Sequence, residues 1–341
     1  MNEKSTIKKR KGSWTRREFL SAVVTGGVAG ATGFTLFNYF QKKEPKTETF
    51  IASVGDYQAN LKQFILQGFR ELNISSSEVA GKRILLKPNL VEPHSNFAHI
   101  NTHPLVIQAV AESFLQLGAS KVIVAEGAGH RRDSLLVLEE SGLADVLYED
   151  KIPFRDLNSG PVVKIKNFNG ESKLGDLILP KELLLADFVV SMPKMKTHHW
   201  AGVTLAMKNM FGVMPGIAYG WPKNVLHWAG ITQSILDINA TVKPHLAIVD
   251  GIVGMEGDGP IMGDPVKSNV LVMGRNLPAV DATCARIMGI NPQKIPYLKH
   301  ASGRLGSIKR SNIEQRGEGI SSVQKEFKLF DYIPAHRGIR L

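Results

Sequence analysis

Short runs of apolar, often β-branched residues alternate along the chain with segments in which apolar residues recur every three or four positions. Runs of the first kind are typical of strands buried on both faces of a parallel sheet, and segments of the second kind are typical of helices packed on it. The predicted strands span residues 83–89, 120–129, 186–194, 245–254 and 269–276. The predicted helices span residues 104–117, 133–141, 203–214, 225–240 and 279–288.

This alternation predicts an α/β fold with a largely parallel sheet flanked by helices. We expect residues 50–335 to form a single α/β domain, preceded by a polar linker at 41–49. The stretch 151–180 contains "VVKIKNF" and several glycines, and it predicts a small β-rich insertion.

Residues 1–40 differ in character from the rest of the chain. A basic segment is followed by "TRREFL", which contains Arg16 and Arg17, and then by an apolar run at 21–40 that glycines dilute. This order resembles the twin-arginine export signal of bacteria, and the run is long enough for a membrane helix. We see no small-x-small cleavage site after it. The leader predicts export by the twin-arginine translocase to the periplasm, or retention as an N-terminal anchor at the outer face of the cytoplasmic membrane.

Charge and cysteine content exclude several classes of function. The formal net charge is +11, but the first 46 residues hold ten Lys/Arg and three Asp/Glu, so most of the excess lies in the leader. Nucleic acid is therefore not an expected partner. The single cysteine, Cys284, excludes an internal disulfide, a four-cysteine zinc site and a cysteine-ligated iron–sulfur cluster within this chain. We expect Cys284 to be a small buried helix residue.

Polar side chains follow the apolar strands at their C-terminal ends. Lys87 and Asn89 end the first, Glu126 the second, Lys194 and Lys196 the third. In open α/β sheets, ligands bind in the crevice beyond these ends, so we expect a cleft of mixed charge there. The alternative is that these residues simply begin the loops.

The stretch "KMKTHHW" places Lys194, Lys196 and His198 two residues apart. In an extended segment they project to one side, and such a face favours a carboxylate, a phosphate or a nucleotide. A solvated loop is the alternative. We expect Lys194 and Lys196 to bind the anion and His198 to take part in catalysis.

The predicted helix at 203–214 has a core-facing stripe of Met207, Met210, Phe211 and Met214. Lys208 lies at the edge of this stripe, where burial could lower its pKa and make it a nucleophile or base. The alternative is a lysine whose stem is buried and whose amine reaches solvent.

Two further residues complete the predicted set around Lys208. Thr204 lies on the same flank of the helix as Lys208, so we expect it to contact the ligand. His227 lies at the margin of a later apolar stripe, and it is a catalytic candidate only together with His198 and Lys208.

Carboxylates gather in "DGIVGMEGDGPIMGDP" at 250–265. Asp250, Glu256 and Asp258 lie within nine positions among glycines and could bind a divalent metal ion or sugar hydroxyls. A turn-rich surface loop is the alternative.

The motifs together resemble one protein family. They are "LLKPNLV", "THPLVIQAV", "GASKVIVAEGAG", "MPKMKTH", "GVTLAMKNMFGVMPG", "AIVDGIVGMEGDGP" and "AVDATCARIMGI", in order from about residue 50 to 305. They resemble the bacterial and archaeal family known as domain of unknown function 362. The resemblance implies an α/β fold and an enzymatic or redox-accessory role. Members often carry a ferredoxin-like cluster module, which this chain lacks, so an iron–sulfur protein partner is one implication.

A shorter stretch resembles the nickel-pincer nucleotide lactate racemases. In that family a histidine is followed ten residues later by a lysine that holds the cofactor, then by a Pro-Gly turn and a metal-ligating histidine. Here His198 is followed by Lys208, Pro215-Gly216 and His227. The turn lies further from the lysine than in that family. This resemblance implies a nucleotide-derived cofactor and isomerase or racemase chemistry.

Two functions follow as predictions. The first is an exported enzyme that binds a small anionic or nucleotide-like ligand, with or without a divalent metal, at the strand ends. The second is a non-catalytic redox-accessory protein at the membrane, associated with an iron–sulfur partner.

Overall fold

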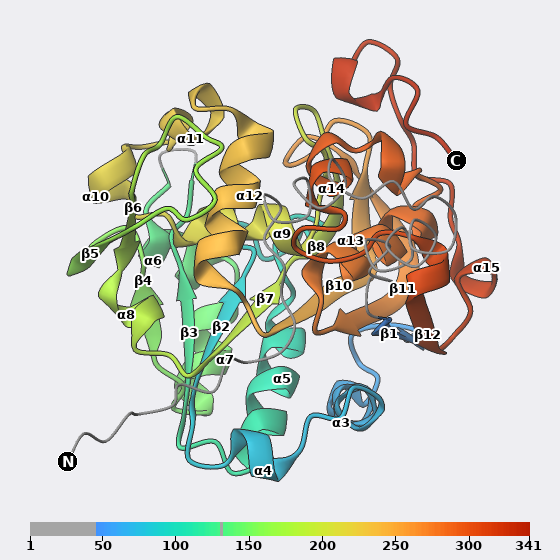
Figure 1. Ribbon diagram of the computed structural model, residues 1–341. Helices are drawn as coiled ribbons and strands as arrows, with labels where there is room; N and C mark the ends of the chain where they lie inside the picture. The colour runs from blue at the N-terminus through green and yellow to red at the C-terminus, as the bar shows by residue number, and fades with distance from the viewer. Residues whose placement is uncertain (1–45, 130–131) are drawn as a thin grey trace, which may run out of the picture. The chain divides into compact units, whose positions relative to one another are not determined.

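The computed structural model describes residues 46–129 and 132–341 (Figure 1). The leader predicted at 1–40 and residues 41–45 of the linker lie outside this part, so the prediction of a twin-arginine signal does too. Within the described ranges, no helix combines the length and the apolar character that a membrane span requires.

The main sheet has ten strands, and it is mixed but mostly parallel, as the sequence predicts. Its path is β12-β1-β11-β10-β7-β2-β3-β4, with β8 and β9 attached beside β10. The strands are β1 (Thr47–Ser53), β2 (Arg83–Pro88), β3 (Lys121–Glu126), β4 (Phe154–Asp156), β7 (Phe188–Met192), β8 (Lys194–His198), β9 (Gly202–Thr204), β10 (Leu246–Glu256), β11 (Asp264–Gly274) and β12 (Ile313–Gly317).

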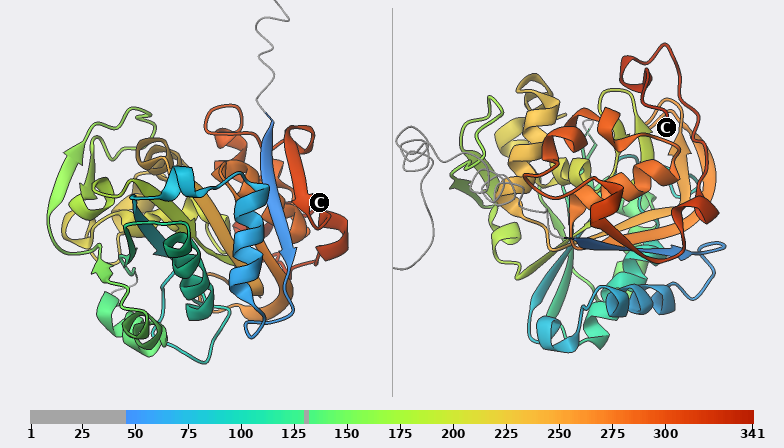
Figure 2. Two further views of the ribbon diagram at one scale, coloured as in Figure 1. Left: turned by 90° about the horizontal axis from the view of Figure 1, so that it is seen from below. Right: turned by 45° about the vertical axis from the view of Figure 1, so that its right-hand side comes forward.

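Strand directions divide the sheet into two parts. Strands β10, β7, β2, β3 and β4 run parallel to their neighbours within this group, so their C-terminal ends share one edge. Strand β11 is antiparallel to both β10 and β1, whereas β1 and β12 pair in parallel. Figure 2 shows β1, in blue, lying beside the C-terminal strand β12, in red.

Helices cover both faces of the sheet. The α-helices are α3 (Leu61–Glu71), α4 (Ser76–Val79), α5 (Pro104–Gln116), α6 (Ser134–Glu140), α7 (Leu143–Glu149), α8 (Lys181–Leu184), α9 (Ala206–Asn209), α10 (Gly216–Tyr219), α11 (Asn224–Trp228), α12 (Ile231–Val242), α13 (Leu277–Ile287), α14 (Pro296–Ala301) and α15 (Ile320–Val323). Single 3-10 turns are η1 (Met210–Val213), η2 (Pro292–Lys294), η3 (Arg310–Asn312) and η4 (Pro334–His336).

Alternation along the central strands builds two cores. Ile84 and Leu86 of β2 pack with α3, α5, α6 and α7, whereas Leu85, between them, packs on the opposite face with α9, α12, α13 and α14. Successive side chains of a strand point to opposite faces, so a strand covered by helices on both sides is apolar throughout. This is why the predicted strands read as continuous apolar runs.

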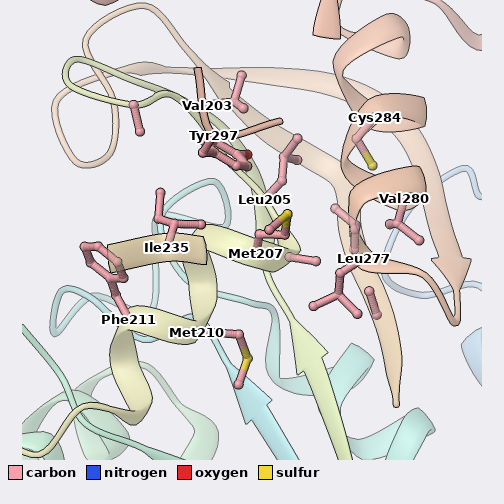
Figure 3. Packing of buried hydrophobic residues seen from close by; sticks show 14 of the residues in the cluster. Val203, Leu205, Met207, Met210, Phe211, Ile235, Leu277, Val280, Cys284 and Tyr297 are labelled. Carbon is pink, nitrogen blue, oxygen red and sulfur yellow. The ribbon is translucent and has the colours of Figure 1, made fainter. Parts of the chain in front are cut away.

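The stripe of Met207, Met210, Phe211 and Met214 lies in the second core, as predicted for packing residues. Figure 3 shows the first three beside Ile235, Leu277 and Tyr297. Cys284 is fully buried in the same core, on α13. Its sulfur therefore contributes packing, as the sequence predicts.

Three predicted elements differ from the structure. The helix predicted at 203–214 begins only at Ala206, where the buried Asp281 of α13 accepts hydrogen bonds from the first turn of α9. Residues 203 and 204 end strand β9, and α9 continues directly into η1. The helix predicted at 225–240 is divided by Gly230, which has φ +100°. The segment 151–180 contains β4, which joins the main sheet, and an antiparallel pair, β5 (Val162–Ile165) and β6 (Leu177–Pro180).

Candidate functional site

A cavity of about 230 Å³ opens beyond the C-terminal ends of β2 and β3 and beside β8, β9 and α9. Its position is that of ligand sites in open α/β sheets. Seven predicted residues line it: Lys87, Asn89, Glu126, His198, Thr204, Lys208 and His227. Residues separated by up to 140 positions in the sequence therefore meet in one place, as the strand-end pattern predicts.

An ion pair between Lys87 and Glu126 forms part of the wall. The Lys87 Nζ donates to Glu126 Oε2 at 2.6 Å, to Asn209 Oδ1 at 3.0 Å and to the Pro88 carbonyl at 2.8 Å. Burial lowers the pKa of Lys87, and the charge of Glu126 opposes this shift. Since three acceptors occupy the three N–H groups of the ammonium, Lys87 is a structural cation rather than a free ligand for an anion.

Gly212 allows the backbone to approach this pair closely. A Cβ atom added at Gly212 would collide with the Glu126 carboxylate and with the Lys87 amine. Only glycine fits here without displacing the ion pair. The 3-10 turn η1, which carries Gly212, therefore packs directly against the Lys87–Glu126 pair.

Lys208 faces the cavity from α9. Its Nζ lies 4.0 Å from the centroid of the Phe211 ring, a cation–π distance. Burial, and then the charge of the nearby Lys87, lower the pKa of Lys208 from 10.5 to about 7. Within the described ranges Lys208 forms no salt bridge with a carboxylate. Its amine therefore has an accessible neutral form at neutral pH, which a base or nucleophile needs.

The position of Lys208 is set by a carboxylate on another helix. Asp281 of α13 accepts from the backbone N–H of Ala206 at 2.7 Å and of Met207 at 3.0 Å. These are two of the N–H groups that a helix start leaves unpaired. The first turn of α9 is thus fixed to α13, and Lys208 is the next residue along it.

Lys223 is a second amine in the cavity, and our sequence analysis missed it. It is 4% exposed and lies at the start of α11 with φ +66°, a conformation that costs a side-chain-bearing residue energy. Its Nζ donates to the carbonyl oxygens of Gly127 at 2.6 Å and Gly212 at 3.4 Å. Burial lowers the pKa of Lys223 to about 7. The one sequence signal was a lysine inside an otherwise apolar, Gly/Pro-rich turn.

The His198 ring is held in one orientation at the end of β8. Its Nδ1 accepts from the backbone N–H of Trp200 at 3.0 Å and of Ala201 at 3.2 Å. A neutral imidazole that accepts at Nδ1 carries its proton at Nε2. Burial, and then the charge of Lys208, lower the pKa of His198 well below 6.5. His198 therefore offers an N–H donor to the site. The His227 ring packs edge-on against Trp200, with ring centroids 4.8 Å apart.

Two oxygens in the wall have no hydrogen-bond partner among the described residues. They are Oγ1 of Thr204, a residue that is 5% exposed, and Oδ1 of Asn89. A buried polar atom without a partner costs free energy, so such atoms in a cavity indicate groups that a ligand satisfies.

The structure does not bring Lys194 and Lys196 to this cavity. Lys194 Nζ lies 2.5 Å from Asp250 Oδ2 in a fully buried pair, to which Tyr57 also donates at 3.0 Å. Lys196 Nζ donates to the Pro260 carbonyl at 3.2 Å, and burial lowers its pKa well below 10.5. Neither lines the cavity, although His198 of the same strand does.

The structure also separates the three carboxylates predicted as metal ligands. The carboxylate of Asp250 forms an ion pair with Lys194, whereas Glu256 accepts a hydrogen bond from the Lys328 backbone N–H at 2.9 Å. Asp258 lies 3.6 Å from His199. In the part of the chain that the structure describes, no three His, Cys, Asp or Glu side chains are grouped to hold a metal ion. We therefore assign no metal to these residues.

A family model described as "Domain of unknown function (DUF362)" matches residues 84–286. Thylakoid-associated protein sll1697 of Synechocystis sp. (strain ATCC 27184 / PCC 6803 / Kazusa) is 30% identical over 232 residues, which cover 66% of this chain and 68% of that protein.

Similar solved structures include the lactate racemase apoprotein from Thermoanaerobacterium thermosaccharolyticum, at a TM-score of 0.43 and 14% identity, covering 72% of this chain and 58% of that one. A protein from Thermotoga maritima has a TM-score of 0.41 and 14% identity, covering 68% of this chain and 59% of that one. The chain thus spans less than two thirds of either structure.

Proposed function

The chain belongs to the DUF362 family, and we propose that it is an enzyme that binds a small anion in the cavity at the strand ends. One observation carries this proposal. The amines of Lys208 and Lys223 face one cavity, and neither pairs with a carboxylate within the described ranges. Buried cations normally have an anionic partner, so a ligand that supplies one stabilises both amines.

The remaining wall suits the same ligand. The Nε2–H of His198 and the hydroxyl of Thr204 are hydrogen-bond donors, whereas the Oδ1 of Asn89 accepts and suits a protonated group of the ligand. The Lys87–Glu126 pair is internally satisfied, so it adds little net charge to the cavity. A carboxylate or phosphate held by two amines and two neutral donors fits this set.

Lys208 is the acid/base group in this proposal. Its pKa of about 7 lets it accept a proton from the bound ligand and return it at neutral pH. The His198 N–H stabilises negative charge that develops on a ligand oxygen during the transfer. Lys223 holds the anionic group. We derive no step through a metal ion at Asp250, Glu256 and Asp258, because the structure separates these carboxylates.

Binding and proton transfer are tested separately. Isothermal titration calorimetry with acetate, malonate, phosphate and pyrophosphate measures affinity, and proton NMR in D2O measures exchange of the C–H hydrogens next to the carboxylates of acetate and malonate. We expect at least one probe to bind, and Lys208→Met to lose exchange. Lys299→Met, at an exposed lysine of α14, is the matched control. Absence of binding by all four probes would contradict the proposal.

Location is a separate part of the proposal. The relative from Synechocystis is described as thylakoid-associated. The leader at 1–40 of this chain predicts export and a place at a membrane surface. Replacing Arg16 and Arg17 by lysine removes the feature that the translocase recognises. Cell fractionation should then find the variant retained in the cytoplasm; unchanged export would argue against the twin-arginine route.

A further inference from the structure

A second cavity lies next to the first. Its volume is about 600 Å³, and it is lined by the turn between β8 and β9, by η2, and by the C-terminal segment 332–339. The first cavity alone is smaller than the roughly 300 Å³ at which pockets for small-molecule ligands usually begin, whereas the two together fall within the usual range. A ligand of usual size that enters the first cavity therefore extends beyond it, and the second cavity is the adjoining space.

Two side chains separate the cavities. His199 and Trp200 line both of them, so these residues form the wall between. The Trp200 ring packs edge-on against His199 and His227, at centroid distances of 4.8 Å, yet 57% of the residue is exposed. His199 in turn lies 3.6 Å from Asp258. A ligand that leaves the first cavity in this direction must pass along the Trp200 ring.

The chemistry of the second cavity differs from that of its neighbour. Lys294 and Arg337 supply two exposed cations, and Tyr332 adds an aromatic face that is 66% exposed. Among the described residues that line this cavity there is no carboxylate. The Arg337 Nε donates to the Asp331 carbonyl at 2.7 Å, which fixes the base of the guanidinium and leaves its terminal N–H groups for another acceptor.

We propose that the ligand is an elongated small molecule with an anionic group at each end. One end lies in the first cavity with Lys208 and Lys223, the middle passes along Trp200, and the other end binds Lys294 and Arg337. This inference rests on the proposed function, since it assumes that the first cavity holds an anion. Exposed cations contribute more to selectivity than to affinity. Lys294 and Arg337 therefore discriminate between ligands of different length.

The experiment compares two series of ligands with the full-length protein. Linear α,ω-dicarboxylates from malonate to sebacate and linear monocarboxylates of the same lengths are titrated by calorimetry. We expect the longer dicarboxylates to bind roughly 3- to 30-fold more tightly than monocarboxylates of equal length, which corresponds to two exposed ion pairs. The shortest dicarboxylate should show no such advantage, because it cannot reach past Trp200.

Variants assign the advantage to the second cavity. In Lys294→Met/Arg337→Met the long dicarboxylates should lose it, while malonate affinity stays unchanged; Lys299→Met should leave both unchanged. The fluorescence of Trp200 is obtained as the difference between the spectra of the wild type and Trp200→Phe. This difference should change when a long dicarboxylate is added and should not change with malonate.

The outcomes separate the two proposals. If malonate binds and chain length or the second charge has no effect, the extended ligand is refuted and the first cavity stands. If neither series binds, the extended ligand is refuted, and the proposed function fails as well unless phosphate or pyrophosphate binds.

Discussion

Replacing Lys208 by methionine should stabilise the protein at neutral pH while removing anion binding. The amine of Lys208 has a pKa of about 7 in the folded state against an ordinary 10.5. At about 1.4 kcal/mol per pKa unit, this shift of three and a half units corresponds to a penalty of up to about 5 kcal/mol. Partial solvent exposure of the side chain and loss of its contact with Phe211 reduce the expected net gain to about 1–3 kcal/mol.

The sign of the pH dependence follows from proton binding. Between about pH 7 and pH 10.5 the unfolded chain binds a proton at Lys208 that the folded chain does not, so the free energy of unfolding of the wild type rises with pH in this window. Below pH 7 both states are protonated and the penalty is complete. The advantage of Lys208→Met should therefore be largest at and below pH 7 and should shrink as the pH rises towards 10.

Urea unfolding of both proteins at pH 6, 7.5 and 9 measures this difference. Methionine keeps the unbranched stem that packs beside Phe211, so the comparison isolates the amine. A variant that is less stable than wild type at pH 6, or a difference that does not change between pH 6 and 9, would refute the account of Lys208 as a destabilised cation.

Three further variants test the framework of the site. Glu126→Gln leaves the buried Lys87 ammonium without a carboxylate, so urea unfolding should show a loss of about 3–5 kcal/mol, most of which Lys87→Met/Glu126→Gln should recover; no recovery would mean that the pair is not the cause. Gly212→Ala should cost about 1–3 kcal/mol, because its Cβ meets the same pair, whereas Gly129→Ala, in the same cavity with nothing within 4 Å of its added Cβ, should stay within about 0.5 kcal/mol; equal losses would contradict this. Asp281→Ala removes two hydrogen bonds to the start of α9, so thermal unfolding should show a loss of about 1–3 kcal/mol, and calorimetry should show weaker anion binding; a variant that keeps full affinity would show that α9 does not depend on Asp281.

The fold and the strand-end residues could be predicted because both depend on local patterns. Continuous apolar runs marked the strands, and the shared edge of parallel strands placed Lys87, Asn89 and Glu126 together. The match to the DUF362 family confirms the resemblance that the ordered motifs showed.

The rest of the site depends on contacts that no local pattern encodes. Lys223 reaches the carbonyl of Gly127, 96 positions away, from a left-handed turn. The helix predicted at 203–214 begins only at Ala206, where a carboxylate on α13 accepts hydrogen bonds from the first turn of α9. Lys194 was predicted to bind the anion, but the spacing of charges on β8 does not reveal that Asp250 of β10 already neutralises it.

The central claim is that Lys208 and Lys223 bind an anion, and proton uptake on binding tests this claim most directly. At pH 8, amines with a pKa of about 7 are mostly neutral, and a bound anion favours their charged form. Calorimetric titration of malonate in buffers of different ionisation enthalpy gives the number of protons exchanged. We predict an uptake of roughly one proton per malonate at pH 8, held by Lys223, and much less at pH 6. Binding at pH 8 without proton uptake, or with uptake that persists in Lys208→Met/Lys223→Met, would contradict the account.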